Sequence, residues 1–333
     1  MDDYEDIPRT AIAQPQQQVT PRRRPNRGRL RCILGLLVFG GLLIATRFSQ
    51  LWLSFDVLNH FTLHFAILTV AFAIGYFMPF ARVFTAIVLS LFAFAGIGAY
   101  AQFRSADVHV IGTAQPGEEQ LRLLTFNTRL VNDDTEQIVS EIRRLEPDVA
   151  VLIEFGENKR VALDLLKKEY PYTADCAQTR YCHFAIISKI PIVSSEAKGI
   201  WKGPPLIRAT LGGRVSGLNI VGVHTIRAPH VRAQFIQMSE LADYVNQNGK
   251  FVVMGDLNAT PFARVLSIFS ERTGLRRLTS IPSWPGYLEM PQLAIDHIFV
   301  SPQIRLLEEA RIGKRSGSDH YPVTVKVAVA RGN

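Results

Sequence analysis

Three long apolar segments dominate the N-terminal third of the chain. They cover residues 30–53, 57–81 and 83–103, and the last two contain no Asp, Glu, Lys or Arg. A helix of about 20 apolar residues can cross the hydrocarbon core of a bilayer, so three transmembrane helices are predicted here. The first segment is the weakest, because only residues 32–46 are free of charge and Arg47 must extend to the membrane surface.

Two histidines, His60 and His64, stand one helical turn apart near the start of the second segment. Histidines at this spacing can bind a metal. Close to the end of a membrane helix, we interpret them instead as polar residues at the membrane–water interface.

Charge sets the expected orientation of these segments. The net charge is +8, and much of it comes from arginines at positions 22, 23, 24, 27, 29 and 31. Residues 1–29 are otherwise rich in Gln and Pro, which predicts a disordered basic tail. A basic run before the first span, together with Arg82 between the second and third, predicts a cytoplasmic N-terminus. Three spans then place everything after residue 104 on the outer side of the membrane.

The pattern changes after a polar linker at residues 105–118. From 119 to 330, short apolar runs alternate with segments of helical spacing, which predicts an α/β (or α+β) domain. Strands are expected at 121–127, 149–154, 185–188, 207–211, 219–224, 251–255, 295–301 and 323–329, and helices at 135–145, 159–168 and 231–247.

Polar residues able to do chemistry stand at the ends of many of these strands. The set comprises Asn127, Glu154, His224, Asp256, Asn258, Asp296, Asp319 and His320. Strand ends of packed sheets meet at a common rim, where ligand sites form. We therefore expect these side chains to converge on one site.

Residues 255–261, GDLNATP, form the most specific of these motifs. Asp256 and Asn258 stand two positions apart just after a buried strand, so their side chains can point the same way. Asp256 there can position or deprotonate water, and Asn258 can donate to a phosphoryl oxygen. An Asx-turn that closes the strand is expected at the same place.

A second motif is SDHYP at residues 318–322. The Asp319 carboxylate suits a hard cation, and the His320 imidazole suits proton transfer or a phosphate contact. Asp296 interrupts an apolar strand, and a buried carboxylate is rarely unpaired. We expect it to pair with His320, fixing the imidazole tautomer.

Six motifs in this order resemble the endonuclease/exonuclease/phosphatase superfamily. They are LTFN at 124–127, IE at 153–154, GVHT at 222–225, GDLNATP at 255–261, IDHI at 295–298 and SDHYP at 318–322. The whole chain resembles a bacterial membrane-anchored branch of that superfamily. This resemblance implies a four-layer αββα sandwich of two mixed β-sheets, preceded by transmembrane helices and held in the bacterial inner membrane with the catalytic domain on the periplasmic or extracellular side.

The resemblance also implies roles. Glu154 would be the main Mg²⁺ ligand, with Mn²⁺ as an alternative metal, and Asn127 and Asp319 would lie close by. Asp256 would activate water, while Asn258 and His224 would bind the scissile phosphate. His320 paired with Asp296 would complete the acid–base machinery.

One position departs from the pattern of many abasic-site nucleases, which carry Asp two residues after the first-strand Asn. Here that residue is Arg129, so such a nuclease is disfavoured. Arg129 can contact a substrate phosphate or be solvated. Arg208, inside an expected strand, is a second weak phosphate-binding candidate, and an arginine on the sheet face is an equal alternative.

Cys176 and Cys182 stand six residues apart. A zinc half-site, two free thiols and a short-loop disulfide all fit the spacing. The outward topology favours the disulfide, which needs an oxidising compartment.

The expected function is that of a membrane-anchored, Mg²⁺-dependent phosphoesterase acting on a lipid head group, a nucleotide or nucleic acid. One alternative is an outward-facing nuclease on extracellular DNA or RNA. Another is a catalytically inactive binding or signalling module that keeps the fold. The expected partners are the lipid bilayer and a phosphate-ester substrate, with nucleic acid as a further candidate.

Overall fold

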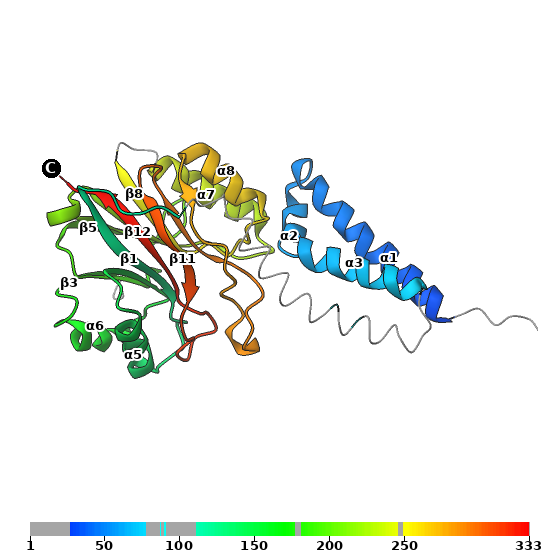
Figure 1. The fold of residues 1–333 in the computed structure, drawn as a ribbon, viewed down its shortest axis with the longest axis horizontal. Helices are drawn as coiled ribbons and strands as arrows, with labels where there is room; N and C mark the ends of the chain where they lie inside the picture. Colours follow the sequence, from blue (N-terminus) through cyan, green and yellow to red (C-terminus); the bar gives the residue numbers. More distant parts are fainter. Residues whose placement is uncertain are drawn as a thin grey trace, which may run out of the picture.

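Two mixed β-sheets of six strands each form the C-terminal region, residues 111–332 (Figure 1). The computed structural model describes residues 27–77, 87, 90, 111–176, 181–245 and 249–332. The first sheet has the order β11–β12–β1–β2–β4–β3, and the second β5–β6–β7–β8–β10–β9. The strands are β1 (Glu118–Asn127), β2 (Val149–Ile153), β3 (Tyr172–Asp175), β4 (Phe184–Ser188), β5 (Ile192–Lys198), β6 (Leu206–Leu211), β7 (Leu218–His224), β8 (Lys250–Asp256), β9 (Arg276–Arg277), β10 (Asp296–Val300), β11 (Arg305–Ile312) and β12 (Val323–Ala330).

A single parallel pair lies at the centre of each sheet. It is β1 with β2 in the first sheet and β7 with β8 in the second, and the other strand pairs are antiparallel. Parallel neighbours end at the same edge of a sheet. The ends of these two parallel strands therefore lie at the same edge of each sheet, which we call the rim.

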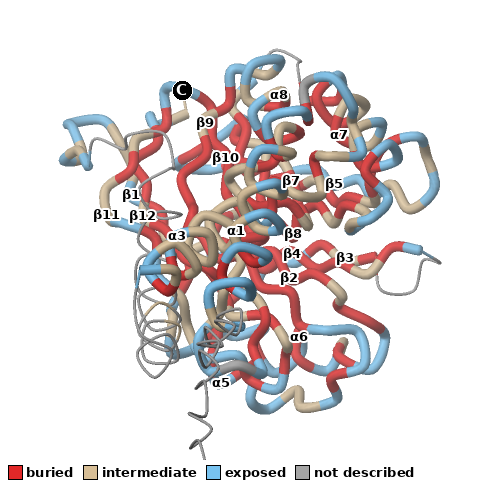
Figure 2. The backbone as a smooth tube through the Cα atoms, turned by 90° about the vertical axis from the view of Figure 1, so that its right-hand side faces the viewer, coloured by how far each residue is buried: buried red, intermediate tan, exposed pale blue. Residues whose placement is uncertain are grey.

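Helices cover the outer face of each sheet. They are α5 (Thr135–Leu145), η3 (Glu157–Lys159) and α6 (Val161–Leu166) beside the first sheet, and α7 (Val231–Val245) and α8 (Arg264–Thr273) beside the second; the short turns η4 (Gly213–Val215) and η5 (Gly286–Leu288) lie in loops. Figure 2 shows the strands buried between these more exposed outer helices.

The alternation along β1 explains the layers. Leu121 and Leu123 point into the core between the two sheets, whereas Leu124 and Phe126 pack with α5 and α6. A third apolar cluster joins α7 and α8 to the outer face of the second sheet. The four-layer αββα sandwich of two mixed sheets is confirmed.

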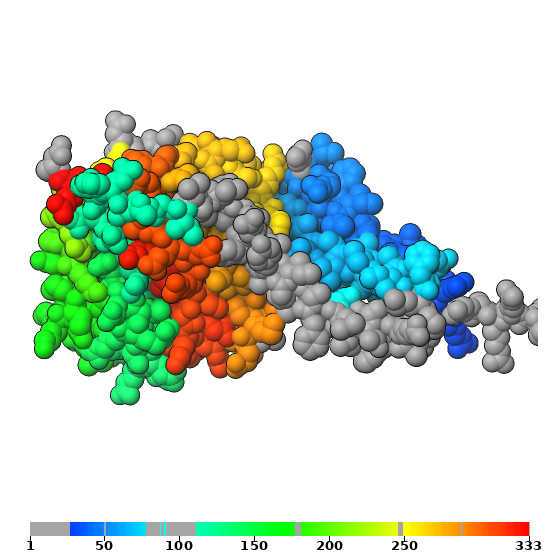
Figure 3. Space-filling model, viewed as in Figure 1, coloured from blue at the N-terminus to red at the C-terminus, as the bar shows by residue number. Residues whose placement is uncertain are grey.

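Two N-terminal helices form an antiparallel hairpin that projects away from the sandwich (Figure 1). Helix α1 (Arg27–Ala45) packs along α3 (Thr62–Phe77), and the rings of Phe39 and Phe72 stack with centroids 5.6 Å apart. Between them, η1 (Thr46–Gln50), η2 (Leu53–Phe55) and α2 (Asp56–Asn59) form the hairpin tip, which we define as residues 46–62. In Figure 3 the blue hairpin meets the gold surface of the sandwich.

The described residues do not support several transmembrane helices. Among these residues, one helical stretch is long and apolar enough to cross a membrane: Arg27–Ser49, which is α1 with most of η1. The pieces Leu53–Asn59 and Thr62–Phe77 make a second candidate only if they are counted as one span, and they are bent by 64°. The third predicted span, apart from residues 87 and 90, lies outside the described residues, as do residues 1–26 of the predicted tail and 105–110 of the predicted linker.

The predicted ends of the first two spans need correction. Helix α1 ends at Ala45 rather than near residue 53, and residues 57–61 belong to the hairpin tip rather than to a span. The physical reason is that polar side chains interrupt the apolar pattern. Asp56, Asn59 and His60 are buried in this tip, where they form hydrogen bonds that a hydrocarbon core would not supply.

Candidate active site

Strand register brings the predicted site residues to one rim. In the second sheet His224 stands opposite Asp256, and Asp256 stands opposite Asp296 across the next strand pair. In the first sheet Asn127 pairs with Ile153, one residue before Glu154. The two sheets face each other, so these strand ends lie together although they are distant in sequence.

Gly255 allows the close approach of β7 and β8 just before the rim. A Cβ at this position would lie 1.9 Å from the carbonyl oxygen of Val223. No side chain fits there without separating the two strands, so the glycine is required for the register that sets His224 beside Asp256.

Glu154 is held in a fixed orientation at the end of β2. Its Oε2 accepts a hydrogen bond from the backbone N–H of Leu130 at 2.7 Å, and its Oε1 accepts one from Asn127 Nδ2 at 3.1 Å. Its backbone has φ of +52°, in the left-handed region that costs a non-glycine residue free energy. Asn258, in the GDLNATP segment, has φ of +45°. Such strain gathers where a structure must aim particular side chains.

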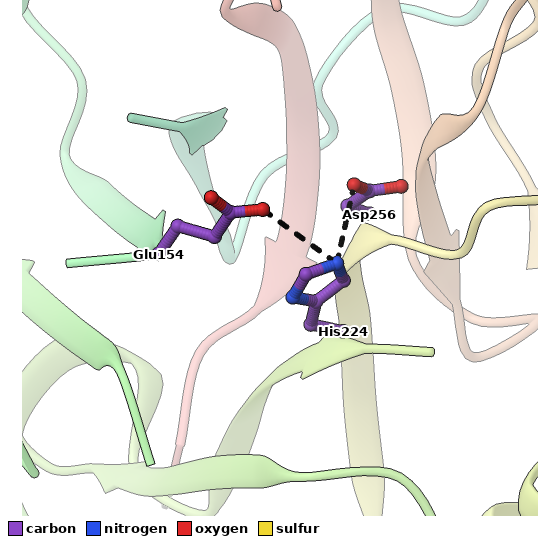
Figure 4. Close-up of side chains that lie close together, drawn as sticks. All are labelled: Glu154, His224 and Asp256. Carbon is purple, nitrogen blue, oxygen red and sulfur yellow. Dashed lines mark ion pairs between the residues drawn. The ribbon is translucent and has the colours of Figure 1, made fainter. Parts of the chain in front are cut away.

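Asp256 lies at the centre of the cluster and is 2% exposed. Its Oδ2 accepts from Asn127 Nδ2 at 3.0 Å and lies 3.5 Å from His224 Nε2 and 3.7 Å from His320 Nε2. Burial raises the pKa of its carboxyl group, although the nearby histidines act in the opposite direction. Figure 4 shows the imidazole of His224 between the carboxylates of Glu154 and Asp256.

His320 and Asp296 form the expected buried pair. His320 Nδ1 lies 2.8 Å from Asp296 Oδ2, which also accepts a hydrogen bond from Ser283 Oγ at 2.6 Å. Burial lowers the pKa of His320, but the Asp296 and Asp256 carboxylates outweigh it and raise the pKa to about 10. The ring is therefore a cation at neutral pH, with Nε2 directed at Asp256.

Asn258 follows Asp256 on a tight turn. Its backbone N–H donates to Asp256 Oδ1 at 3.0 Å, which is the expected Asx-turn, and its Nδ2 donates to the carbonyl of Thr225 at 3.0 Å. Gln234 of α7 was not among the predicted residues, and it donates to the carbonyls of Leu257 and Asn258. The signal in the sequence was a glutamine on the apolar face of an expected helix, and in the structure it is buried.

A cavity of about 870 Å³ opens over this cluster. Its lining includes six predicted site residues, His224, Glu154, Asp256, Asn258, Asp319 and His320. The remaining wall comes from residues 225–230, from Trp284, Leu293 and Ile295, and from His60 and Phe61 of the hairpin tip.

Three further predicted residues, Asn127, Arg129 and Arg208, do not line the cavity. Asn127 bridges Glu154 and Asp256 through its amide nitrogen, while its oxygen accepts the N–H of Arg129. Arg129 lies beside Asp319, with Nε 4.0 Å from Oδ1. Arg208 is not brought to the cavity: it pairs with Glu196 at 3.6 Å and lies over the ring of Tyr244.

The donor set fits a divalent cation. Glu154, His224 and Asp256 each offer a ligand atom, and these atoms all lie within 4.8 Å of one another. Two of the three donors are carboxylates, which suit a hard cation such as Mg²⁺. The second group at this spacing, Asp256, Asp296 and His320, already contains an imidazolium between its carboxylates and is less suited to a metal.

Comparisons with known proteins find similarity in both the sequence and the fold. The sequence model described as the Endonuclease/Exonuclease/phosphatase family matches residues 124–320. An endonuclease/exonuclease/phosphatase from Bacteroides vulgatus is 16% identical, covers 63% of this chain and 98% of its own, and superposes with a TM-score of 0.54. Another from Beutenbergia cavernae is 19% identical, with coverage of 63% and 72% and a TM-score of 0.51. No match was found among curated protein sequences.

Proposed function

The chain belongs to the endonuclease/exonuclease/phosphatase family and is a hydrolase of phosphoric ester bonds, and on that premise we propose that it is a membrane-held, Mg²⁺-dependent phosphoesterase. The observation that carries this proposal is that Glu154, Asp256, His224 and His320 line one cavity, with Asp296 paired to His320 behind it. An inactive module that only kept the fold would have no need to retain all of them in hydrogen-bonded positions.

Asp256 is suited to orient and deprotonate the attacking water. It is buried, and burial raises the pKa of its carboxyl group toward the range in which a carboxylate accepts a proton. Asn127 and the N–H of Asn258 hold its two oxygens in place. The water would bind beside Oδ2, next to His224 and His320.

Three side chains are placed to meet the charge of the phosphoryl group. His320 is a cation, and His224 and Asn258 are donors that line the same cavity. Fixed donors aimed at developing charge lower the barrier because they need no reorganisation during the reaction. Asp296 keeps the His320 ring oriented and charged throughout.

Glu154 would hold the metal, with Asn127 and Asp319 beside it. When bound, Mg²⁺ would supply Lewis-acid polarisation of a phosphoryl oxygen and charge neutralisation.

Membrane attachment is part of the same proposal. Helix α1 is long and apolar enough to cross a bilayer, and the arginine run precedes it. Because the hairpin tip is hydrogen-bonded to the C-terminal region, both would lie on the same side of the membrane. With the arginines in the cytoplasm, that side would be the outer one.

The test uses the full chain purified in detergent with bis-p-nitrophenyl phosphate as substrate, with Mg²⁺ or with EDTA. We expect Mg²⁺-dependent release of p-nitrophenolate, and a decrease of at least about 10³-fold in kcat/KM for Glu154→Gln because a metal ligand is lost. Glu309→Gln is the matched control, since Glu309 is exposed on β11 and should keep full activity. Turnover that persists in EDTA or in Glu154→Gln contradicts the proposal.

A further inference from the structure

The hairpin tip forms one wall of the active-site cavity. His60 and Phe61 line the same cavity as Glu154, Asp256 and His320, although nearly 100 residues separate the tip from the nearest of these in sequence. A segment that served only as a tether would not need to reach the chemistry.

Specific polar contacts fix the tip to the C-terminal region. His60 Nδ1 accepts the backbone N–H of Thr260, which belongs to the GDLNATP segment, at 3.1 Å. Asp56 Oδ1 accepts the N–H of Arg264, the first residue of α8, at 2.9 Å. Asp56 is 1% exposed and His60 is 6% exposed. The tip is thus built into the sandwich beside the site, and it supplies the helix cap that α8 lacks from its own chain neighbours.

The contact with Thr260 also determines which nitrogen of His60 carries a proton. A backbone N–H is always a donor, so Nδ1 must be unprotonated where it accepts. The proton of the neutral ring is therefore on Nε2, and His60 is one of the residues that line the cavity. An oxygen of an incoming phosphate ester is the kind of partner that such a donor binds.

The outer surface of the tip is aromatic and apolar. Trp52 is 69% exposed, Leu51 75%, Phe48 47% and Phe61 39%. Exposed Trp and Phe next to an apolar helix are typical of the membrane–water interface. Exposed apolar side chains continue along both helices, at Leu34, Leu37, Val70 and Phe77. A bilayer around the hairpin would therefore reach the tip, and the cavity would lie at the membrane surface.

The mouth of the cavity offers both polar and apolar surface, as the binding of a lipid phosphoester requires. Exposed Arg227 and His230 offer positive or polar groups to a head group. Ile226, Leu293 and Phe61 offer apolar surface to the first part of an acyl or alkyl chain. A nucleotide or a nucleic acid has no long hydrocarbon chain to lie along the exposed apolar side chains of the hairpin.

We propose that the hairpin tip completes the substrate site and that the substrate is the phosphate ester of a membrane lipid, with His60 contacting its head group and Phe61 its hydrocarbon chain. This inference rests on the proposed phosphoesterase function and gives it a substrate class. The tip is then a specificity element, and removing the hairpin would remove part of the site as well as the anchor.

The test compares two chromogenic diesters that share a leaving group: p-nitrophenyl methyl phosphate and p-nitrophenyl hexadecyl phosphate. The full chain is assayed with Mg²⁺ in detergent micelles. We expect kcat/KM to be at least tenfold higher for the hexadecyl ester. Phe61→Ala should lower that preference about tenfold, because it removes contacts with the hydrocarbon chain that the methyl ester does not have.

Phe48→Ala is the matched control. Phe48 is an exposed aromatic of the same tip, but it does not line the cavity, so its substitution should leave the preference unchanged. Equal kcat/KM for the two esters, or equal effects of Phe61→Ala and Phe48→Ala, would overturn the inference and leave the phosphoesterase proposal standing.

A binding measurement separates the two proposals if neither diester is cleaved. Hexadecylphosphonate and methylphosphonate cannot be hydrolysed at their C–P bond, and their binding is measured by calorimetry in the same micelles. We expect hexadecylphosphonate to bind more tightly, and about tenfold less tightly to Phe61→Ala than to Phe48→Ala. If its chain gives no gain in affinity over methylphosphonate, the lipid site is refuted whatever the catalytic result.

Discussion

Asp296 shows how one buried carboxylate sets the state of a neighbouring residue. It is 1% exposed, its Oδ2 faces both His320 Nδ1 and Ser283 Oγ, and no described residue donates a hydrogen bond to its Oδ1. A buried charge is tolerated when a partner of opposite charge lies against it. Here His320 is that partner, and the Asp296 carboxylate favours the charged form of its imidazole.

Asp296→Asn should lower kcat on bis-p-nitrophenyl phosphate by on the order of 10²–10⁴-fold, because the charge that keeps His320 protonated and oriented is lost. Ser283→Ala serves as the comparison, since it removes one hydrogen bond to the same oxygen but leaves the carboxylate in place. It should cost less than about tenfold, on the scale of a single neutral hydrogen bond. Kinetics and thermal unfolding are measured for both; a folded Asp296→Asn enzyme with near wild-type kcat would rule out this role.

At the residue scale the sequence identified nearly the whole cluster. Strand-end polar residues in apolar surroundings were the signal, and Glu154, His224, Asp256, Asp296 and His320 all lie where that signal predicted. His60 was interpreted as an interfacial residue, because nothing local to residues 57–64 shows that Thr260 will lie beside it. Arg208 was a candidate on chemical type alone, and the sheet directs it to Glu196 instead.

At the element scale, the strands that the apolar pattern missed are all at the edges of the sheets. They are β3 and β11 in the first sheet and β5 and β9 in the second. An edge strand has fewer neighbours to pack against, so its residues need not be apolar. In β5, for example, none of the seven residues is buried. The expected central strands were found because their buried faces demand apolar residues.

Helix α8 depends on a cap from another element. Asp56 Oδ1 accepts both the N–H of Arg264 and Asn59 Nδ2, so Asp56→Ala removes one acceptor from each of these two donors. We expect a loss of about 1–3 kcal/mol in unfolding free energy, and a smaller loss for Asp56→Asn, which keeps an acceptor oxygen.

Thermal unfolding of the full chain in detergent measures this effect. Asp243→Ala is the control, since Asp243 is an exposed acid whose pair with Arg272 should contribute under about 1 kcal/mol. Equal losses for Asp56→Ala and Asp243→Ala would show that the tip does not stabilise α8.

At the scale of the whole molecule, the hairpin and the sandwich act together. The tip binds beside the active site, and the hairpin carries the apolar surface away from it (Figure 1). A disulfide joins Cys176 and Cys182 at the end of β3, on the first sheet. Such a bond persists in an oxidising compartment, which agrees with the proposed outward orientation.

The orientation is tested by thiol labelling of intact cells with a membrane-impermeant maleimide. Cys176 and Cys182 are buried, so the reporter is a new cysteine, Glu309→Cys, on a Cys32→Ser background. We expect it to label without permeabilisation, whereas Gln17→Cys, ahead of the arginine run, should label only in permeabilised cells. The reverse pattern would place the C-terminal region in the cytoplasm.

The sequence by itself determined an α/β domain and the chemistry of its rim, and the resemblance to a known family implied the four-layer sandwich. Central strands must be apolar on their buried faces, and the polar residues that end them stand out against that background. It also showed an apolar N-terminal segment, because no folding is needed to read hydropathy. Only the tertiary structure decided where the helices of that segment end and which surface its tip contacts. Those outcomes depend on pairs such as His60 with Thr260 and Asp56 with Arg264, about 200 residues apart. The local sequence pattern cannot predict such pairs. A hydrogen bond between two distant residues places no constraint on the residues next to either of them in the sequence.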